Sequence, residues 1–269
     1  MRSARFSKEQ IPLASLTAFW RYGVVKTLRK WKAAALSPVL AARGDGPVRS
    51  AYGVLMVPNW QDTTFRYCIF GTYGSDLSDL LLGQAEDFVF VDIGANQGLY
   101  SLIAAQNPWC RSIIAFEPVP QTHARLAANV ALNGGADRTV LHQLAIADSV
   151  GEVEISVAEG HTGTATLAGR DGKSGGGVVI HTIDAALVDP LLAGELPMFV
   201  KIDVEGLEAV VIAELAKTAS FARVSAIFYE VDDRWASARE IETLLRAAGF
   251  TRFAKYGRGH HYDVLATRT

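Results

Sequence analysis

The sequence predicts an α/β fold in which helices cover both faces of a mostly parallel sheet. Its 269 residues are 49% hydrophobic and 20% charged, which is the balance of a folded globular protein. From Phe88 onward, short apolar runs alternate with segments of helical character. Runs that are apolar throughout are typical of strands buried on both faces. We therefore expect one sheet domain over residues 88–269.

The order of the expected elements follows from this alternation. The expected strands are Phe88–Ile93, Ser112–Phe116, Val140–Ile146, Met198–Ile202 and Val224–Tyr229. The expected helices are Leu99–Gln106, Gln121–Asn133, Gly206–Ala216 and Ala238–Ala248. A β insertion interrupts the alternation with short strands at Glu152–Val157, Ala165–Leu167 and Val178–Ile183. A closing hairpin is expected from Thr251–Tyr256 and Tyr262–Thr267.

The first 50 residues are predicted to form a separate basic extension. Residues 1–32 hold eight basic side chains and one acidic one, a net charge of +7; the whole chain carries −2, so the remainder carries −9. From Leu13 to Ala35 the apolar residues recur at helical spacing, mostly opposite the basic ones. This amphipathic helix either packs on the sheet domain or rests on an anionic membrane surface. A linker rich in glycine and proline follows at residues 43–50.

Residues 51–87 are predicted to lead into the core through short strands and a helix. Scattered β-type residues suggest strands or a hairpin within Val54–Phe70, and Ser75–Leu82 has the pattern of a helix capped by Ser75. The two cysteines, Cys68 and Cys110, are too few for a disulfide framework and lack metal-ligand spacing. With no leader-like or membrane-spanning run, we expect a cytoplasmic protein, or one at the inner membrane face if the basic helix binds lipid.

The most informative motif is a glycine turn that follows the first expected strand. Residues 91–98 read VDIGANQG and lead directly into a helix. A dinucleotide-binding fingerprint requires glycine where Asp92 stands, and a carboxylate there repels a pyrophosphate but attracts an ammonium group. S-adenosylmethionine has an ammonium, a sulfonium and no phosphate, so the turn favours it over NAD. The residues expected to bind it here are Asp92, Gly94, Ala95, Asn96 and Gly98.

Glu117 supplies a second carboxylate at the end of the next expected strand. It lies 25 residues beyond Asp92. An acidic residue in this place is positioned to accept hydrogen bonds from both ribose hydroxyls of an adenosyl ligand. The turn and Glu117 together therefore predict a site for S-adenosylmethionine.

These motifs, with others further along, resemble the FkbM family of methyltransferases. The matching segments are VDIGANQG (91–98), FEP (116–118), LAIADSVGEVEI (144–155), GTATL (163–167), HTID (181–184), KIDVEG (201–206) and FYEV (228–231). The resemblance covers the chain from about Gly74 onward. It implies a Rossmann-like class I methyltransferase fold with a seven-stranded, mostly parallel sheet in the order 3-2-1-4-5-7-6. It also implies adenine contacts from Ala145 and Ile146, and methyl transfer to oxygen, commonly a hydroxyl of a sugar or natural product.

A second acidic cluster follows the fourth expected strand. Alternation along that strand places Lys201, Asp203 and Glu205 on one side, near the point where ligands bind in open α/β sheets. Asp203 or Glu205 is expected to deprotonate or orient the acceptor hydroxyl, and Lys201 to keep the cluster charged or position Asp203. The alternative is that the two acids only cap the next helix. His161 and Glu230 are candidate acceptor contacts. No metal site is predicted, although Asp203, Glu205 and Glu230 offer the oxygen ligands that suit Mg²⁺.

Three other functions compete with this interpretation. A nicotinamide-dependent oxidoreductase is disfavoured because Asp92 replaces the first fingerprint glycine. A non-catalytic interaction module is disfavoured because both acidic motifs are intact. An RNA methyltransferase is disfavoured because the sheet domain is acidic and would repel a phosphate backbone. We expect a small-molecule or carbohydrate acceptor, and the sequence does not predict an oligomeric state.

Overall fold

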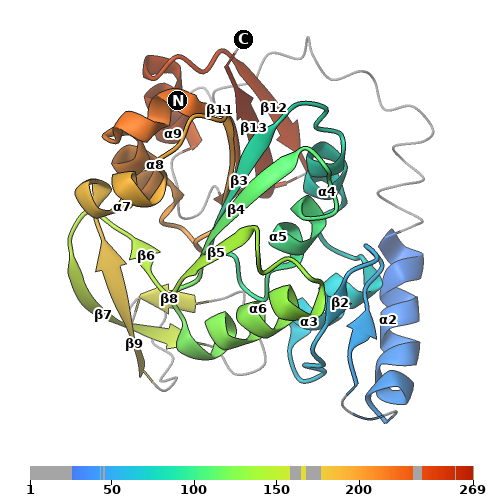
Figure 1. Ribbon diagram of the computed structural model, residues 1–269. Helices are drawn as coiled ribbons and strands as arrows, with labels where there is room; N and C mark the ends of the chain where they lie inside the picture. Colours follow the sequence, from blue (N-terminus) through green and yellow to red (C-terminus); the bar gives the residue numbers. More distant parts are fainter. Residues whose placement is uncertain are drawn as a thin grey trace.

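The computed structural model places a seven-stranded sheet at the centre of the chain (Figure 1). It describes residues 26–42, 44, 46–157, 165–167, 177–232, 238–257 and 259–268. The strand order in the sheet is β5-β4-β3-β10-β11-β13-β12. These strands are β3 (Phe88–Ile93), β4 (Cys110–Phe116), β5 (Thr139–His142), β10 (Met198–Ile202), β11 (Val224–Asp232), β12 (Arg252–Tyr256) and β13 (His261–Thr267).

The topology of this sheet confirms the predicted fold class. Numbered along the chain, its strands lie in the order 3-2-1-4-5-7-6. All neighbouring pairs are parallel except those made by β13, which runs antiparallel to both β11 and β12. The direction in which successive strands are added to the sheet reverses between β3 and β10, with β4 and β5 on one side of this point and β11 on the other. Ligands bind at such a point in sheets of this kind.

Helices cover both faces of the sheet and divide the core into two layers (Figure 1). On β3, Val91 and Ile93 join the core beneath α8 and α9, while Phe88 and Phe90 join the core beneath α4 and α5. This division follows from the period of two along a strand. The helices are α4 (Ser75–Leu82), α5 (Leu99–Ala104) and α6 (Pro120–Leu132) on one side, and α7 (Ala185–Leu191), α8 (Glu208–Ala216) and α9 (Ala238–Ala247) on the other, with the 3₁₀ turn η3 (Ala219–Arg223) before β11.

The predicted β insertion forms a second sheet of four strands. Their order is β6-β9-β7-β8. The strands are β6 (Ala145–Ile146), β7 (Gly151–Val157), β8 (Ala165–Leu167) and β9 (Gly177–Ile183). The prediction of one continuous strand over Val140–Ile146 was wrong, because the chain leaves the main sheet after His142 and pairs Ala145 and Ile146 with β9. An apolar run alone does not reveal such a change of partner.

The segment before β3 packs on the same core as the sheet. It comprises α2 (Lys26–Ala41), β1 (Val48–Arg49), β2 (Leu55–Met56), α3 (Thr63–Phe70) and then α4. Buried Met56, Phe65 and Leu77 belong to the core that also contains Phe90 and Phe199. Residues 51–87 therefore share one hydrophobic core with the sheet domain.

The expectation of strands or a hairpin within Val54–Phe70 was wrong for the second half of this segment. Thr63–Phe70 is helical, and the side chain of Asp62 caps it by accepting a hydrogen bond from the Phe65 amide at 2.8 Å. Phe65, Cys68 and Ile69 are buried, a spacing that suits a helix better than a strand. The helix Ser75–Leu82 is confirmed, but Gly74 rather than Ser75 occupies its N-cap position.

Asn129 of α6 and Asn133, the residue that caps the end of this helix, hold β2 against the sheet domain. The Asn133 amide accepts from the Leu55 amide at 2.9 Å and donates to the Leu55 carbonyl at 2.8 Å. Asn129, which is fully buried, accepts from the Val57 amide at 2.7 Å. These side chains supply the hydrogen-bond partners that a further strand would otherwise give to this stretch of backbone, because buried backbone groups need partners.

The described part of the basic extension is α2, which continues six residues beyond the predicted end at Ala35. Leu40 packs against the core next to the sheet, whereas Leu28 and Trp31 are 62% and 74% exposed. Residues 1–25, which include the start of the predicted helix, lie outside the described residues. Among the described residues, no helix combines the length and the apolarity needed to cross a bilayer.

Candidate active site

A buried lysine connects the ends of the two central strands. Lys201 on β10 lies beside Asp92 on β3, with Nζ 3.3 Å from Asp92 Oδ1, and both side chains are buried. The ammonium also donates to the carbonyls of Gly94 at 2.5 Å and Ile93 at 3.3 Å. Burial alone would lower the pKa of Lys201, but the carboxylates of Asp92 and Asp203 outweigh it and raise the pKa above its ordinary value. Lys201 therefore stays charged and fixes the turn after β3.

Asp92 lies on β3, directly before the glycine turn, and anchors it through internal contacts. Its side chain is fully buried, and its Oδ2 accepts a hydrogen bond from Ser101 Oγ at 2.7 Å. Oδ1 faces the Lys201 ammonium at 3.3 Å as an ion pair, without a hydrogen bond of its own among the described residues. The sequence predicted that this carboxylate would face the ammonium group of a ligand; in the structure it contacts Lys201 of β10 and Ser101 of α5. A buried carboxylate needs such partners because an unpaired one is costly.

Gly94 is required by a close approach of the neighbouring loop. Its φ is +74°, in the left-handed region, and a Cβ at this position would overlap the carbonyl oxygen of Asp203. The sequence analysis attributed the glycine to close contact with a ligand. The structure shows a second reason: Gly94 lets the loops after β3 and β10 pack against each other, which brings Asp203 to the turn.

Glu117 binds the same turn from the other side. It directly follows β4, and its two carboxylate oxygens accept from the amides of Asn96 at 2.9 Å and Val119 at 3.0 Å. Burial raises the pKa of Glu117 to about 7, although both hydrogen bonds act to lower it. The strand ends carrying Asp92 and Glu117 are thus adjacent, as predicted, and each oxygen of Glu117 keeps a second lone pair for a further donor.

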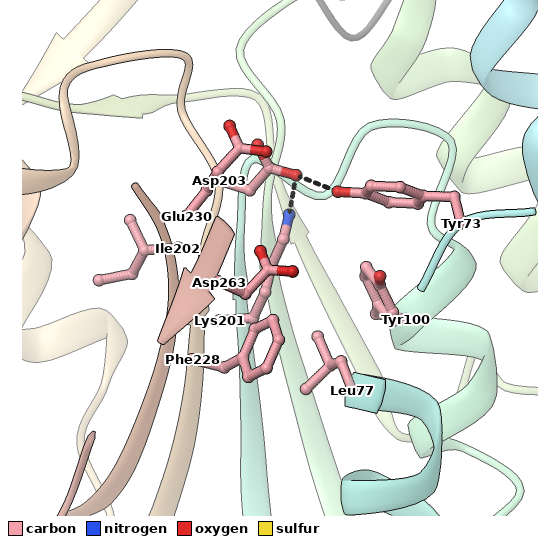
Figure 2. Close-up of a pocket in the computed structure, with 9 residues that line it drawn as sticks. All are labelled: Tyr73, Leu77, Tyr100, Lys201, Ile202, Asp203, Phe228, Glu230 and Asp263. Atoms are coloured by element: carbon pink, nitrogen blue, oxygen red, sulfur yellow. Dashed lines mark hydrogen bonds and ion pairs between the residues drawn. The ribbon is translucent and has the colours of Figure 1, made fainter. Parts of the chain in front are cut away.

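A pocket beyond the ends of β10 and β11 combines carboxylates with aromatic walls (Figure 2). Its acidic residues are Asp203, Glu230 and Asp263, which come from three different elements. Asp203 Oδ2 accepts from the Tyr73 hydroxyl at 3.0 Å and lies 3.7 Å from Lys201 Nζ. The remaining walls are formed by Tyr73, Leu77, Tyr100, Ile202 and Phe228. The cavity is small, with about 10 Å³ of space, which is enough for roughly one water molecule.

Burial and neighbouring carboxylates raise the pKa values of two acids of this pocket, Glu230 and Asp263. Burial raises the pKa of Asp263 to about 7, and Glu230 and Asp203 add to the shift. Burial and repulsion by Asp203 likewise raise the pKa of Glu230. Register places Glu230 opposite Asp263 on the antiparallel pair β11 and β13. Groups with shifted pKa values that share a pocket are candidates for proton transfer.

His261 is the charge partner of Glu230 at the rim of this pocket. Its Nε2 lies 2.7 Å from Glu230 Oε1, and its Nδ1 lies 3.7 Å from Asp232 Oδ2. The hydrogen bond to Glu230 raises the pKa of His261 to about 9, against the opposing effect of partial burial. His261 is therefore protonated at neutral pH and partly balances the acidic pocket.

The loop KIDVEG separates the two acids that the sequence grouped together. β10 ends at Ile202, and Glu205 is exposed with a φ of +53°, so strand alternation does not extend to it. Partial desolvation and the charges of Asp203 and Glu230 raise the pKa of Glu205. Glu208, which the sequence analysis missed, holds the loop: its Oε1 accepts from the amides of Val204 and Gly206, both at 3.1 Å.

The remaining candidate residues lie in different surroundings. Ile146 is buried in the main core and Ala145 is half-buried, both on β6 near the end of the third sheet strand. His161 lies outside the described residues. Among the described residues, no group of three or more histidine, cysteine or acidic side chains is arranged to hold a metal ion.

The family model described as "Methyltransferase FkbM domain" matches residues 92–252, more than half of the chain. The chain belongs to the FkbM methyltransferase family. This membership supports S-adenosylmethionine as cofactor and methyl transfer as the general activity. A comparison with curated proteins found no match.

Solved structures with a similar fold include several methyltransferases. The FkbM methyltransferase from Methylobacillus flagellatus KT is 16% identical with a TM-score of 0.48, and the match covers 71% of this chain but only 47% of that one. The ribosomal protein L11 methylase from Lactobacillus delbrueckii subsp. bulgaricus is 16% identical, with coverages of 72% and 78% and a TM-score of 0.41. The precorrin-6y C5,15-methyltransferase from Geobacter metallireducens GS-15 is 15% identical, with coverages of 72% and 87% and a TM-score of 0.39.

The sequence analysis did not predict several residues of the pocket in this FkbM chain. Tyr73 precedes the matched segment and reaches Asp203 only through the fold. Asp263 and His261 lie on the closing hairpin, whose register against β11 places them beside Glu230. A register assigned to the predicted hairpin would have found Asp263, whereas no local pattern marks Tyr73.

Replacing Gly94 tests the close packing of the two loops. Gly94→Ala should lower the free energy of unfolding by about 2 kcal/mol more than Gly134→Ala, measured by urea denaturation. Gly134 is the matched control because its φ is +66° and open space surrounds it, so both variants share the left-handed backbone cost. Equal losses in the two variants would contradict the contact between Gly94 and the Asp203 carbonyl.

Proposed function

We propose that this FkbM methyltransferase transfers a methyl group to a hydroxyl of a sugar, glycan or natural product. The observation that carries the proposal is the position of Asp203. Its backbone packs on the glycine turn and its side chain enters the pocket of Glu230 and Asp263. One residue thus links the expected cofactor turn to the expected acceptor pocket.

The donor set at the turn fits S-adenosylmethionine. The polar groups around it are the carboxylates of Glu117 and Asp203 and the carbonyl groups of the turn, while the nearby ammonium of Lys201 is already engaged by Asp92 and Gly94. Such a set suits a cationic ligand without phosphate. Glu117 would hold the ribose hydroxyls, Gly94, Ala95, Asn96 and Gly98 would line the amino-acid end, and Ala145 with Ile146 would border the adenine, with Asp92 supporting the turn from below.

Asp203 is proposed as the group that accepts or orients the acceptor hydroxyl proton. When bound, S-adenosylmethionine supplies an activated methyl group, whose bond to sulfur breaks as a bond to the acceptor oxygen forms. Asp203 is anchored by Tyr73 and Lys201, so its carboxylate is held in one orientation. Glu230, and Glu205 at the rim, would contact the acceptor and help to take up its proton. Lys201, 3.7 Å from Asp203 Oδ2, would position this carboxylate rather than react itself.

The alternatives differ in what they require of the turn. A nicotinamide enzyme would need a place for a pyrophosphate, but the residues beside this turn include the acids Glu117 and Asp203. A non-catalytic module would have no use for a charged pocket of three carboxylates and a buried lysine. An RNA substrate would need a basic track beside an acidic pocket. These observations favour a small hydroxylated acceptor.

The cofactor proposal is tested by titrating the protein with S-adenosylhomocysteine at several pH values. Ionised Glu117 accepts ribose hydroxyl groups better than the protonated form. With a pKa near 7, affinity should rise about tenfold between pH 6 and pH 8. Glu117→Gln should bind more weakly and show a flat profile, while Glu195→Gln, which alters an exposed glutamate, should behave as wild type. Binding of NAD in place of S-adenosylhomocysteine would contradict the proposal.

We further propose that α2 contacts an anionic membrane surface. Leu28, Trp31 and Val39 are exposed and lie on one side of the helix at spacings of three and eight residues. The chain around them is basic, with a net charge of +7 over residues 1–32. A tryptophan-bearing apolar stripe within a basic segment suits insertion at the lipid headgroup level.

Vesicle binding tests this contact directly. The protein should sediment with phosphatidylglycerol vesicles at low salt, less so at high salt, and not with phosphatidylcholine vesicles. Trp31→Ala should weaken binding about tenfold because the indole loses its apolar burial. Trp109→Ala removes another exposed tryptophan, outside α2, and should have no effect. Equal losses in the two variants, or no binding at low salt, would contradict the proposal.

A further inference from the structure

Tyr73 enters the acceptor pocket from a segment that the family match does not include. It lies in the loop between α3 and α4, whereas the matched segment begins at residue 92. Figure 2 shows its ring pointing into the pocket, with the hydroxyl directed at Asp203. The hydroxyl donates to Asp203 Oδ2 at 3.0 Å. Tyr73 is thus a direct partner of the residue proposed to act on the acceptor.

We propose that Tyr73 is a positioning residue for Asp203. The inference rests on the proposed function of Asp203 and adds a group that no family motif supplies. Both Tyr73 and Lys201 engage Oδ2 of Asp203. With Oδ2 held in this way, Oδ1 is the oxygen that serves the acceptor hydroxyl. A hydrogen bond donated to a carboxylate also favours its ionised form, which is the form able to accept a proton.

The loop holds Tyr73 in place through backbone and ring contacts. The Tyr52 hydroxyl donates a hydrogen bond to the Tyr73 carbonyl. Gly74 follows with a φ of +86°, and the Tyr100 hydroxyl occupies the space that a Cβ would need. The rings of Tyr73 and Tyr100 lie 6.2 Å apart at an angle of 52°. Tyr52 and Tyr100 therefore restrict the Tyr73 side chain to the direction of Asp203.

Other charged groups also face Asp203 and must be kept constant in a test. They are Lys201 on β10, Glu230 on β11, Asp263 on β13, Glu205 in the following loop and Asp92 behind Lys201. Tyr100 on α5 is the other hydroxyl of the pocket. A change from tyrosine to phenylalanine at position 73 leaves all of these side chains in the protein. A difference between wild type and Tyr73→Phe therefore reports the Tyr73 hydroxyl.

The test is carbon-13 NMR of protein labelled at its aspartate carboxyl groups. The Asp203 signal is identified by its absence from Asp203→Asn. At neutral pH the chemical shift of this signal should differ between Tyr73→Phe and wild type, because a charge-assisted hydrogen bond to the carboxylate is lost. Tyr52→Phe, which frees the loop but keeps the Tyr73 hydroxyl, should move it in the same direction by less. Tyr67→Phe, an exposed tyrosine of α3, should leave it unchanged.

The outcomes separate this inference from the cofactor proposal. An Asp203 signal at the same chemical shift in wild type and Tyr73→Phe would overturn the inference, as would an equal displacement of that signal in Tyr67→Phe. Titration with S-adenosylhomocysteine should give the same affinity within about twofold for wild type and Tyr73→Phe, since the hydroxyl acts on Asp203 and not on the turn. If wild type does not bind S-adenosylhomocysteine, the cofactor proposal fails, whereas the NMR comparison still decides the role of Tyr73.

Discussion

The geometry of the site depends on one buried ammonium group, that of Lys201. It bridges the ends of β3 and β10 through Asp92 and the Gly94 carbonyl, and it lies 3.7 Å from Asp203. Removing one partner of a buried ion pair leaves an uncompensated charge, which costs about 3–5 kcal/mol. The two central strand ends are therefore locked together, and every other group of the site is placed relative to them.

This constraint divides the acidic residues into distinct roles. Asp92 forms an ion pair with Lys201 and accepts a hydrogen bond from Ser101. Glu117 connects the turn to β4 and retains lone pairs for a ligand. Asp203 alone reaches from the turn into the aromatic pocket. Carboxylates that look equivalent along the chain thus differ in burial, in partners and in the chemistry left to them.

The sequence predicted the sheet well because its strands are buried on both faces. Apolar runs such as Phe88–Ile93 and Met198–Ile202 coincide with β3 and β10. The prediction failed after His142, where the chain leaves the main sheet and pairs with β9. It also failed at Thr63–Phe70, which contains residue types common in strands but forms a helix whose buried residues follow a helical spacing. These errors are tertiary in origin, since neither the partner of a strand nor the burial of a residue is encoded locally.

The sequence located the strand ends of the candidate site but not all residues of its pocket, for a related reason. Motifs located the ends of β3, β4 and β10, because a glycine turn and terminal acids are local features. Tyr73, His261 and Asp263 reach the pocket through a loop and an antiparallel register, so only the folded chain reveals them.

The most direct test of the central claim is a crystal structure of the protein with S-adenosylhomocysteine. We predict the nucleoside at the ends of β3 and β4, with its ribose hydroxyls on Glu117 and the pair of Lys201 and Asp92 unchanged. A nucleoside bound elsewhere, or one that leaves the Glu117 carboxylate without contact, would contradict the account.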